Sequence, residues 1–240
     1  MAVNPILLIP SRMSATRLPG KPLAIIGSDP MIVHVWRRAV EAGIGEVVVA
    51  CADQVIVDTI TKAGGKAVMT DPNLPSGSDR IWQALECLDP YQKHDVIINL
   101  QGDMPTLNPA IIQKALALLD NPKTDIGTLA AVITDEREKT DSAVVKVVRS
   151  ADGRALYFSR ATVPVGEGIL YHHIGLYTYR RHILQQFVSL PPSVLEKREK
   201  LEQLRALEAG MRIDVAVVDT VPLGVDTPDT LKKAREILCR

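Results

Sequence analysis

The sequence contains little cysteine, and the cysteines that it has show no pattern. Cys51, Cys87 and Cys239 are scattered along the chain and odd in number. No spacing of cysteine and histidine resembles that of a zinc site. This usage is typical of reduced thiols in a cytosolic protein, and we therefore expect a cytoplasmic location.

The chain also lacks an excess of charge and a long apolar stretch. Lys and Arg number 28 together, as do Asp and Glu, so the formal net charge is zero. This balance predicts no nucleic-acid partner and no membrane surface. No segment approaches the roughly 20 apolar residues of a membrane span. The apolar run at residues 6–9 is short and has no basic segment before it, so we expect no signal peptide.

Short apolar runs alternate with helical patterns along most of the chain. The 240 residues, of which 46% are hydrophobic, suffice for one sizeable α/β core. The alternation predicts a mostly parallel sheet with helices on both faces, and we expect a single domain over residues 1–240. The predicted strands are 3–9, 46–50, 95–100 and 213–218, and the predicted helices are 30–43, 53–63, 108–119, 195–209 and from 227 onward.

Turn-forming residues interrupt this alternation in the middle of the chain. The sequence Ser-Ala-Asp-Gly at 150–153 separates apolar runs at 144–148 and 155–158. This pattern predicts a β-hairpin. We therefore expect a small antiparallel insertion at roughly 142–180.

The loop after the first predicted strand carries Arg12, Arg17 and Lys21 within ten residues, together with hydroxyl side chains and a glycine. Fixed cations and donors of this kind suit a triphosphate, whose charge grows on the leaving pyrophosphate during transfer. The loop matches neither a Walker motif nor the glycine fingerprint of dehydrogenases. A solvated basic loop is the alternative, but ligands bind beyond the carboxyl ends of parallel strands, and this loop lies there.

Two aspartates are candidate ligands for magnesium. Asp103 follows the strand predicted at 95–100, and Asp226 precedes the last helix. Mg²⁺ takes one or two carboxylates together with phosphate and water. A turn-forming aspartate and an extended helix cap are the alternative interpretations.

Together the motifs resemble the cytidylyltransferases that activate 3-deoxy-D-manno-octulosonate (Kdo), the CMP-Kdo synthetases. The matching motifs occur in the family's order over nearly the whole chain. Their combination is more specific to this family than the basic loop after the first predicted strand alone. The matching stretches are Arg12–Lys21 (RMSATRLPGK), 76–80 (SGSDR), 101–103 (QGD), 155–164 (ALYFSRATVP), 173–177 (HIGLY), 201–205 (LEQLR) and 224–228 (GVDTP).

The resemblance implies a glycosyltransferase-A-like α/β fold, a homodimer, and a Mg²⁺-dependent transfer of CMP from CTP to Kdo for lipopolysaccharide biosynthesis. It implies that Arg12 and Lys21 hold the triphosphate, that Thr16 and Arg17 assist, and that Asp103 and Asp226 bind Mg²⁺. The implied cytidine neighbours are Ser76, Gly77, Arg80 and Gln101, and the implied sugar-binding residues are Arg160, His173, Tyr177, Glu202 and Gln203.

Some positions depart from the family pattern and keep other substrates open. Met104 stands where many members have Glu, the segment at 165–171 is short, and His172 stands where a basic residue is common. An 8-amino-Kdo or another acidic sugar is therefore an alternative substrate. A nucleotide-binding protein without catalysis is a third reading, and the presence of Asp103, Asp226 and Lys21 speaks against it.

Overall fold

The computed structural model describes residues 3–15 and 17–239. It divides into two compact units, one formed by the chain up to Gln113 together with the chain from Pro222, the other by Lys114–Val221. The single-domain organisation therefore stays a prediction. Among the described residues, no helix has the length and apolar character needed to cross a membrane.

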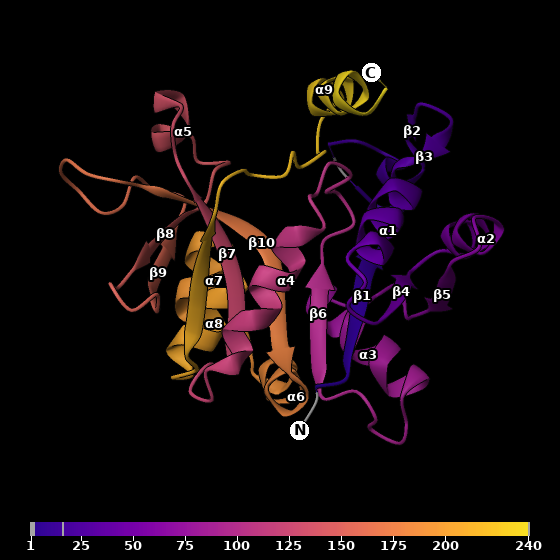
Figure 1. Cartoon of the computed structure of the whole chain (residues 1–240), viewed down its shortest axis with the longest axis horizontal. Helices are drawn as coiled ribbons and strands as arrows, with labels where there is room; N and C mark the ends of the chain where they lie inside the picture. Colours follow the sequence, from indigo (N-terminus) through magenta and orange to yellow (C-terminus); the bar gives the residue numbers. More distant parts are fainter. Residues whose placement is uncertain (1–2, 16, 240) are drawn as a thin grey trace. The chain divides into compact units, whose positions relative to one another are not determined.

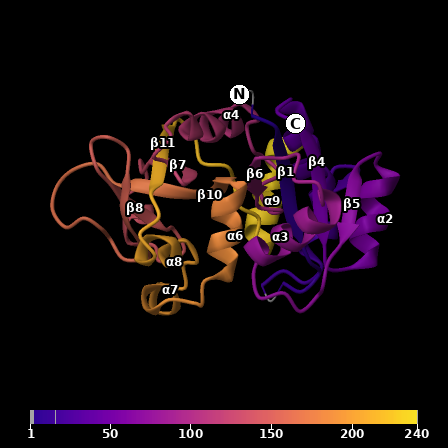
Figure 2. The ribbon, with the colours of Figure 1, turned by 90° about the horizontal axis from the view of Figure 1, so that it is seen from below.

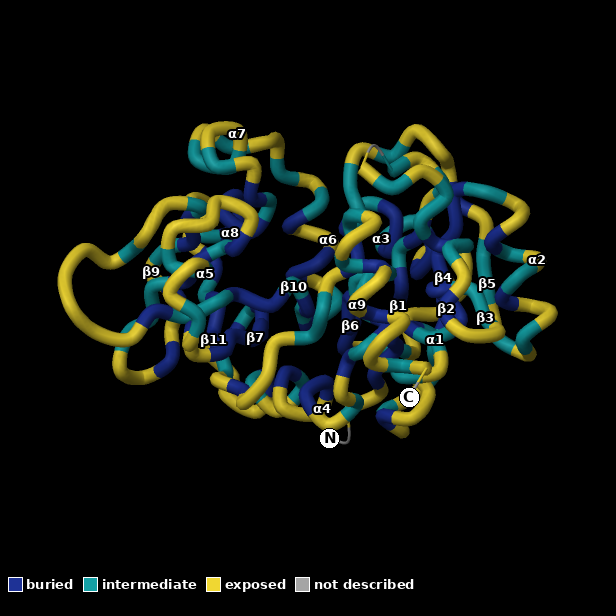
Figure 3. Tube along the Cα trace, turned by 90° about the horizontal axis from the view of Figure 1, so that it is seen from above, coloured by how far each residue is buried: buried dark blue, intermediate teal, exposed yellow. Residues whose placement is uncertain are grey.

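The first unit contains four parallel strands in the order β6-β1-β4-β5, of which β1, β4 and β6 are labelled side by side in Figure 1. They are β1 (Pro5–Ser11), β4 (Glu46–Cys51), β5 (Lys66–Met69) and β6 (Val96–Leu100). Every residue of β6 and all but one of β1 are buried (Figure 3), which accounts for their predominantly apolar sequences.

Helices connect these strands and follow them. They are η1 (Lys21–Leu23), α1 (Met31–Glu41), α2 (Gln54–Lys62), α3 (Gly77–Leu88) and α9 (Pro228–Leu238), with the short strands β2 (Ile25–Ile26) and β3 (Asp29–Pro30) between η1 and α1. Helix α4 (Ala110–Ala117) begins in the first unit and ends in the second. Because each parallel strand is followed by a loop at its carboxyl end, the loops after β1 and β6 emerge at the same edge of the sheet.

The second unit has a mixed sheet. Its strands are β7 (Ile126–Val132), β8 (Lys146–Arg149), β9 (Ala155–Ser159), β10 (Tyr171–Arg180) and β11 (Ile213–Val218). Strand β11 is parallel to β7, whereas β10 is antiparallel to both β7 and β8, and β8 is antiparallel to β9. The remaining elements are η2 (Leu118–Asp120), α5 (Glu136–Thr140), α6 (Arg181–Ser189), α7 (Val194–Glu199) and α8 (Gln203–Glu208).

The predicted α/β class, with mostly parallel strands and an antiparallel insertion, is confirmed. The prediction of one helix over 195–209 is wrong, because the chain forms two separate helices, α7 and α8, which Figure 2 labels apart. Lys200 adopts a left-handed conformation with φ of 57° and ends α7. Hydrophobic spacing alone does not reveal such a break.

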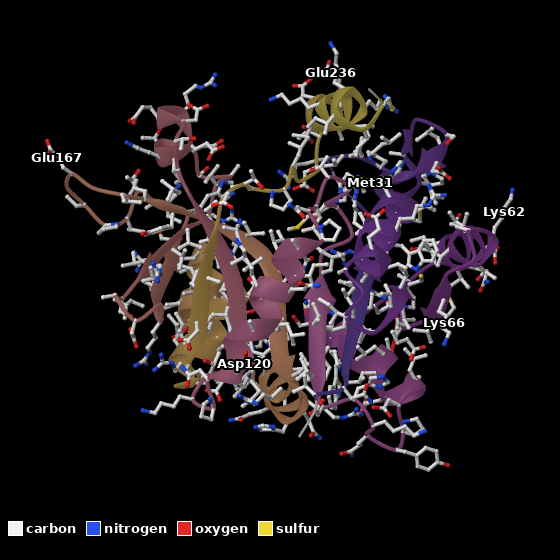
Figure 4. All side chains as sticks on the ribbon, viewed as in Figure 1. Met31, Lys62, Lys66, Asp120, Glu167 and Glu236 are labelled. Atoms are coloured by element: carbon white, nitrogen blue, oxygen red, sulfur yellow. The ribbon has the colours of Figure 1, made fainter. Side chains whose placement is uncertain are left out.

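The loop between β9 and β10 is short and exposed from 164 to 169. Glu167 stands at its far tip (Figure 4). The loop therefore extends from the antiparallel part of the second unit instead of packing into its core.

Candidate active site

The loop that follows β1 presents its cations through a turn that requires glycine. Gly20 has a φ of 70°, and the amide of Lys21 donates to the carbonyl of Leu18 at 3.1 Å. The amide of Met13 donates to the carboxylate of Asp53, which follows β4, at 2.8 Å. The loop is thus anchored to the neighbouring strand, and Lys21 points back toward the carboxyl end of the sheet.

The two candidate metal ligands come from loops joined by a backbone hydrogen bond. The amide of Val225 donates to the carbonyl of Asp103 at 2.9 Å. Val225 is fully buried with Met31 and Leu231 in one apolar cluster, so the residue next to it is held in place. The amide of Asp226 donates to Oγ1 of Thr230, the residue that also completes the capping box of α9.

A glycine allows the loop after β6 to approach β1. A Cβ atom on Gly102 would lie 2.9 Å from the carbonyl oxygen of Pro10. Any other residue would push this loop away from the first strand. The carboxylate of Asp103 would then move relative to the cations of the β1 loop.

Lys21 lies between the two carboxylates. Its Nζ atom donates to Asp103 Oδ2 at 3.0 Å and to Asp226 Oδ1 at 2.7 Å, although 82 and 205 positions separate these residues from Lys21 in sequence. Burial lowers the pKa of Lys21, but the two carboxylates outweigh it and the net pKa is raised. The group is therefore a fixed cation at any physiological pH.

Two further arginines add positive charge to this region. Arg17 donates to Asp226 Oδ2 at 3.0 Å and is largely exposed. Arg80 is almost fully buried and donates to Thr70 Oγ1 at 2.5 Å and to the carbonyl of Asp71 at 3.1 Å. Burial, and then the charge of nearby Arg12, lower the pKa of Arg80.

These residues surround one cavity of about 360 Å³, which is large enough for a small-molecule ligand. Four cationic side chains and two carboxylates line it, a surplus of two positive charges that suits a polyphosphate. The predicted residues that line it are Arg12, Arg17, Lys21, Ser76, Gly77, Arg80, Gln101, Asp103 and Asp226. Thr16, also predicted for this site, lies outside the described residues.

The predicted sugar-binding residues all belong to the second unit. Arg160 follows β9 and is held by carbonyl groups, because its Nε donates to Glu199 at 3.0 Å and its Nη1 to Ser142 at 2.9 Å. The Glu199 carboxylate accepts from the Arg160 amide and from Ser159 Oγ. These contacts hold two of the three guanidinium nitrogens of Arg160, and no described residue bonds to its Nη2.

His173 and Tyr177 lie on β10 with their ring centroids 5.6 Å apart. His173 Nε2 lies 3.0 Å from the hydroxyl oxygen of Thr128. Burial, and then the neighbouring His172, lower the pKa of His173 to about 3, so its ring is neutral at neutral pH. Burial, and then the charge of Glu202, raise the pKa of the Tyr177 phenol, which keeps its proton.

Glu202 and Gln203 stand where α8 begins. Glu202 is the residue before the helix and is half-buried. Its Oε1 lies 3.7 Å from Nη2 of Arg205. Gln203 is buried.

Sequence reasoning missed several residues of these sites. Asp53, which anchors the loop after β1, follows β4 at the same edge of the sheet as the other loops, and the strand-end rule could have found it. Thr70 and Glu199, which hold Arg80 and Arg160, carry no signal in the sequence. Their contacts arise only when distant segments meet.

A cationic cavity with two converging carboxylates at the strand ends is typical of a nucleotidyltransferase. The model of the cytidylyltransferase family matches residues 6–213. The 3-deoxy-manno-octulosonate cytidylyltransferase of Parvibaculum lavamentivorans is 64% identical over 100% of this chain and 95% of its own length. That of Paramagnetospirillum magneticum is 60% identical over 98% of both chains.

A solved structure of CMP:2-keto-3-deoxy-manno-octonic acid synthetase complexed with CTP is also similar. It is 38% identical, the match covers 98% of each chain, and the TM-score is 0.92. The chain belongs to the 3-deoxy-manno-octulosonate cytidylyltransferase family. The family and the nucleotidyltransferase activity predicted from the sequence motifs are therefore confirmed, as is the fold.

Proposed function

We propose that this enzyme transfers CMP from CTP to the anomeric hydroxyl of Kdo, giving CMP-Kdo and pyrophosphate for lipopolysaccharide biosynthesis. The observation that carries the proposal is the position of Lys21 between Asp103 and Asp226 in a cavity with surplus positive charge. The names and identities of the relatives support the same substrates.

The two carboxylates fit a magnesium ion. One oxygen of each lies within 3.0 Å of the same ammonium nitrogen, so both converge on one position that already accommodates a positive charge. Carboxylate oxygens are the protein ligands that Mg²⁺ prefers. We propose that Asp103 and Asp226 hold it, and that the bound ion neutralises phosphate charge during transfer.

The residues of the first unit would bind and orient the triphosphate. In the step itself, the sugar oxygen forms a bond to the α-phosphorus, the bond from that phosphorus to pyrophosphate breaks, and the hydroxyl proton passes to solvent. Arg12, Arg17 and Lys21 supply fixed positive charge where the leaving pyrophosphate gains negative charge. Thr16 is proposed to assist them. Ser76, Gly77, Arg80 and Gln101, which line the same cavity, would border the cytidine.

The residues of the second unit would bind the sugar. Two carbonyl groups accept from Nε and Nη1 of Arg160, which leaves Nη2 available to a carboxylate such as that of Kdo. His173, Tyr177, Glu202 and Gln203 offer hydrogen-bonding groups of both kinds for the sugar hydroxyls. We further propose a homodimer in the cytoplasm, with no nucleic-acid or membrane partner.

The experiment measures pyrophosphate release from CTP and Mg²⁺ with Kdo and 8-amino-Kdo offered separately. Turnover with Kdo is the expected result, and the reaction without a sugar is the control. Turnover with the amino sugar alone would mean that 8-amino-Kdo is the substrate and that the proposed mechanism of transfer still holds. Absence of turnover with both sugars would contradict the proposal.

A further inference from the structure

Thr128 is a fully buried residue of β7 whose hydroxyl contacts three groups of β10. Its Oγ1 lies 3.0 Å from Nε2 of His173, 2.8 Å from the carbonyl of Leu176 and 3.2 Å from the carbonyl of Ile174. The pairing register between β7 and β10 shifts between Ile174 and Tyr177, and Tyr177 is the residue directly opposite Thr128. The hydroxyl of Thr128 therefore contacts both the backbone carbonyls at this register shift and the imidazole of His173.

Counting protons fixes the direction of the bond to His173. A hydroxyl has one proton to donate, and carbonyl oxygens can only accept. The Thr128 proton is therefore directed to the two carbonyls, and its oxygen must accept from Nε2. Since the ring is neutral, its other nitrogen, Nδ1, carries no proton and is an acceptor.

The surroundings of His173 leave Nδ1 without another role in the free protein. The ring packs edge-on against Phe158, with centroids 4.8 Å apart, and against Tyr177. No described residue makes a hydrogen bond to Nδ1. A fixed acceptor of this kind binds a hydroxyl or ammonium donor and repels a carboxylate, which has only acceptors.

We infer that Thr128 is a positioning residue that holds His173 as the neutral Nε2–H tautomer, so that Nδ1 accepts a hydrogen bond from a hydroxyl of the sugar substrate. The inference deepens the proposed function and rests on it for the identity of the sugar. It also predicts the orientation of the bound sugar: the sugar carboxylate binds to Arg160, and a hydroxyl group donates a hydrogen bond to His173. Thr128 itself does not touch the substrate in this scheme.

Three variants separate this role from simple packing. Thr128→Val keeps the shape and removes the hydroxyl, whereas Thr128→Ser keeps the hydroxyl. Thr178→Val is the control, because Thr178 is also fully buried and its hydroxyl, among the described residues, donates to the carbonyl of Ala115 alone, at 3.0 Å. Thr178→Val loses this one buried hydrogen bond and Thr128→Val loses the contacts to His173 and to the two carbonyls, so both are expected to lose some thermal stability, Thr128→Val the more.

The first measurement is the nitrogen-15 NMR spectrum of the imidazole rings in the ligand-free protein. The chain has five histidines, and the His173 signals are assigned by their loss in His173→Gln. The wild type and Thr128→Ser are expected to show the Nε2–H tautomer. In Thr128→Val, the population of the Nδ1–H tautomer is expected to rise. A wild-type protein with the Nδ1–H form would overturn the inference.

The second measurement is the pair of KM values for Kdo and CTP. The KM for Kdo is expected to rise about tenfold in Thr128→Val, with that for CTP changing less than about twofold, because a misplaced proton removes one acceptor for the sugar. Thr128→Ser should restore the wild-type KM, and Thr178→Val should leave both values unchanged. Equal effects of Thr128→Val and Thr178→Val would contradict the positioning role. An inactive wild type would overturn the proposed function, and the NMR measurement would still decide the tautomer.

Discussion

The ammonium nitrogen of Lys21 lies 2.7 Å from Oδ1 of Asp226, although 205 positions separate the two residues in the chain. The contact joins the loop after the first strand to the segment before the last helix. Asp103 also accepts a hydrogen bond from this ammonium group. The positive charge of Lys21 therefore offsets the repulsion between the two carboxylates and allows them to lie close together. Under the proposed function, the same two carboxylates would become available to a metal when the phosphate groups of CTP attract Lys21.

Replacement of Asp103 by Asn tests the proposed metal site. The variant removes one negative charge at the position where phosphate charge must be neutralised, so we expect kcat to fall roughly 100- to 1000-fold. Asp219→Asn is the control, because that carboxylate is 99% exposed in the second unit. The measurement is pyrophosphate release over a magnesium titration, together with the melting temperature. A near-normal rate of Asp103→Asn at saturating magnesium would rule out this ligand.

Replacement of Arg160 by Ala tests the proposed carboxylate site for the sugar. We expect the KM for Kdo to rise more than the KM for CTP, by about tenfold or more, since a charge-assisted hydrogen bond is lost. Arg154→Ala, an exposed arginine in the turn before β9, serves as the control. Steady-state kinetics with each substrate varied in turn give both values. A larger rise in the KM for CTP would place Arg160 in the nucleotide site.

The sequence predicted three of the four parallel strands of the first unit and missed β5. Strands β1, β4 and β6 are largely apolar runs that are followed by polar loops, and this local pattern is sufficient to locate them. The rule that ligands bind beyond the carboxyl ends of parallel strands then predicted that Asp103 lies near the basic loop after β1. The structure brings both to one cavity.

The residues that hold the site in place could not be predicted in this way. Glu199 positions Arg160 across 39 residues of sequence, and Thr128 contacts His173 across 45. Such pairings depend on the register between strands and on the break at Lys200, and neither appears in a pattern of apolar spacing. The sugar-binding residues themselves were suggested only by the family resemblance.

The neutral state of His173 predicts a specific dependence of stability on pH. Its pKa is about 3 in the folded protein and near 6.5 when unfolded, so only the unfolded chain binds a proton between these values. The contribution of His173 to stability is therefore complete above pH 6.5 and is lost as the pH falls toward 3, by up to about 1.4 kcal/mol per pH unit. Urea unfolding from pH 7 to pH 5 should give a shallower decline for His173→Gln than for the wild type. Equal slopes for the two proteins would contradict a neutral, buried imidazole.

Ser11, at the end of β1, carries a hydroxyl that is buried and has no hydrogen-bond partner among the described residues. A buried polar group without a partner costs about 1–3 kcal/mol. We therefore expect Ser11→Ala to raise the free energy of unfolding by about 1 kcal/mol, since relief of this cost exceeds the small loss of strand propensity.

Ser159→Ala is the matched control of opposite sign, because that hydroxyl donates to Glu199 and accepts from the amide of Ala161. Urea unfolding at pH 7 measures both, with equal m-values required for the comparison. If Ser11→Ala were as destabilising as Ser159→Ala, the Ser11 hydroxyl would have a partner in solution, and the end of β1 would owe part of its stability to it.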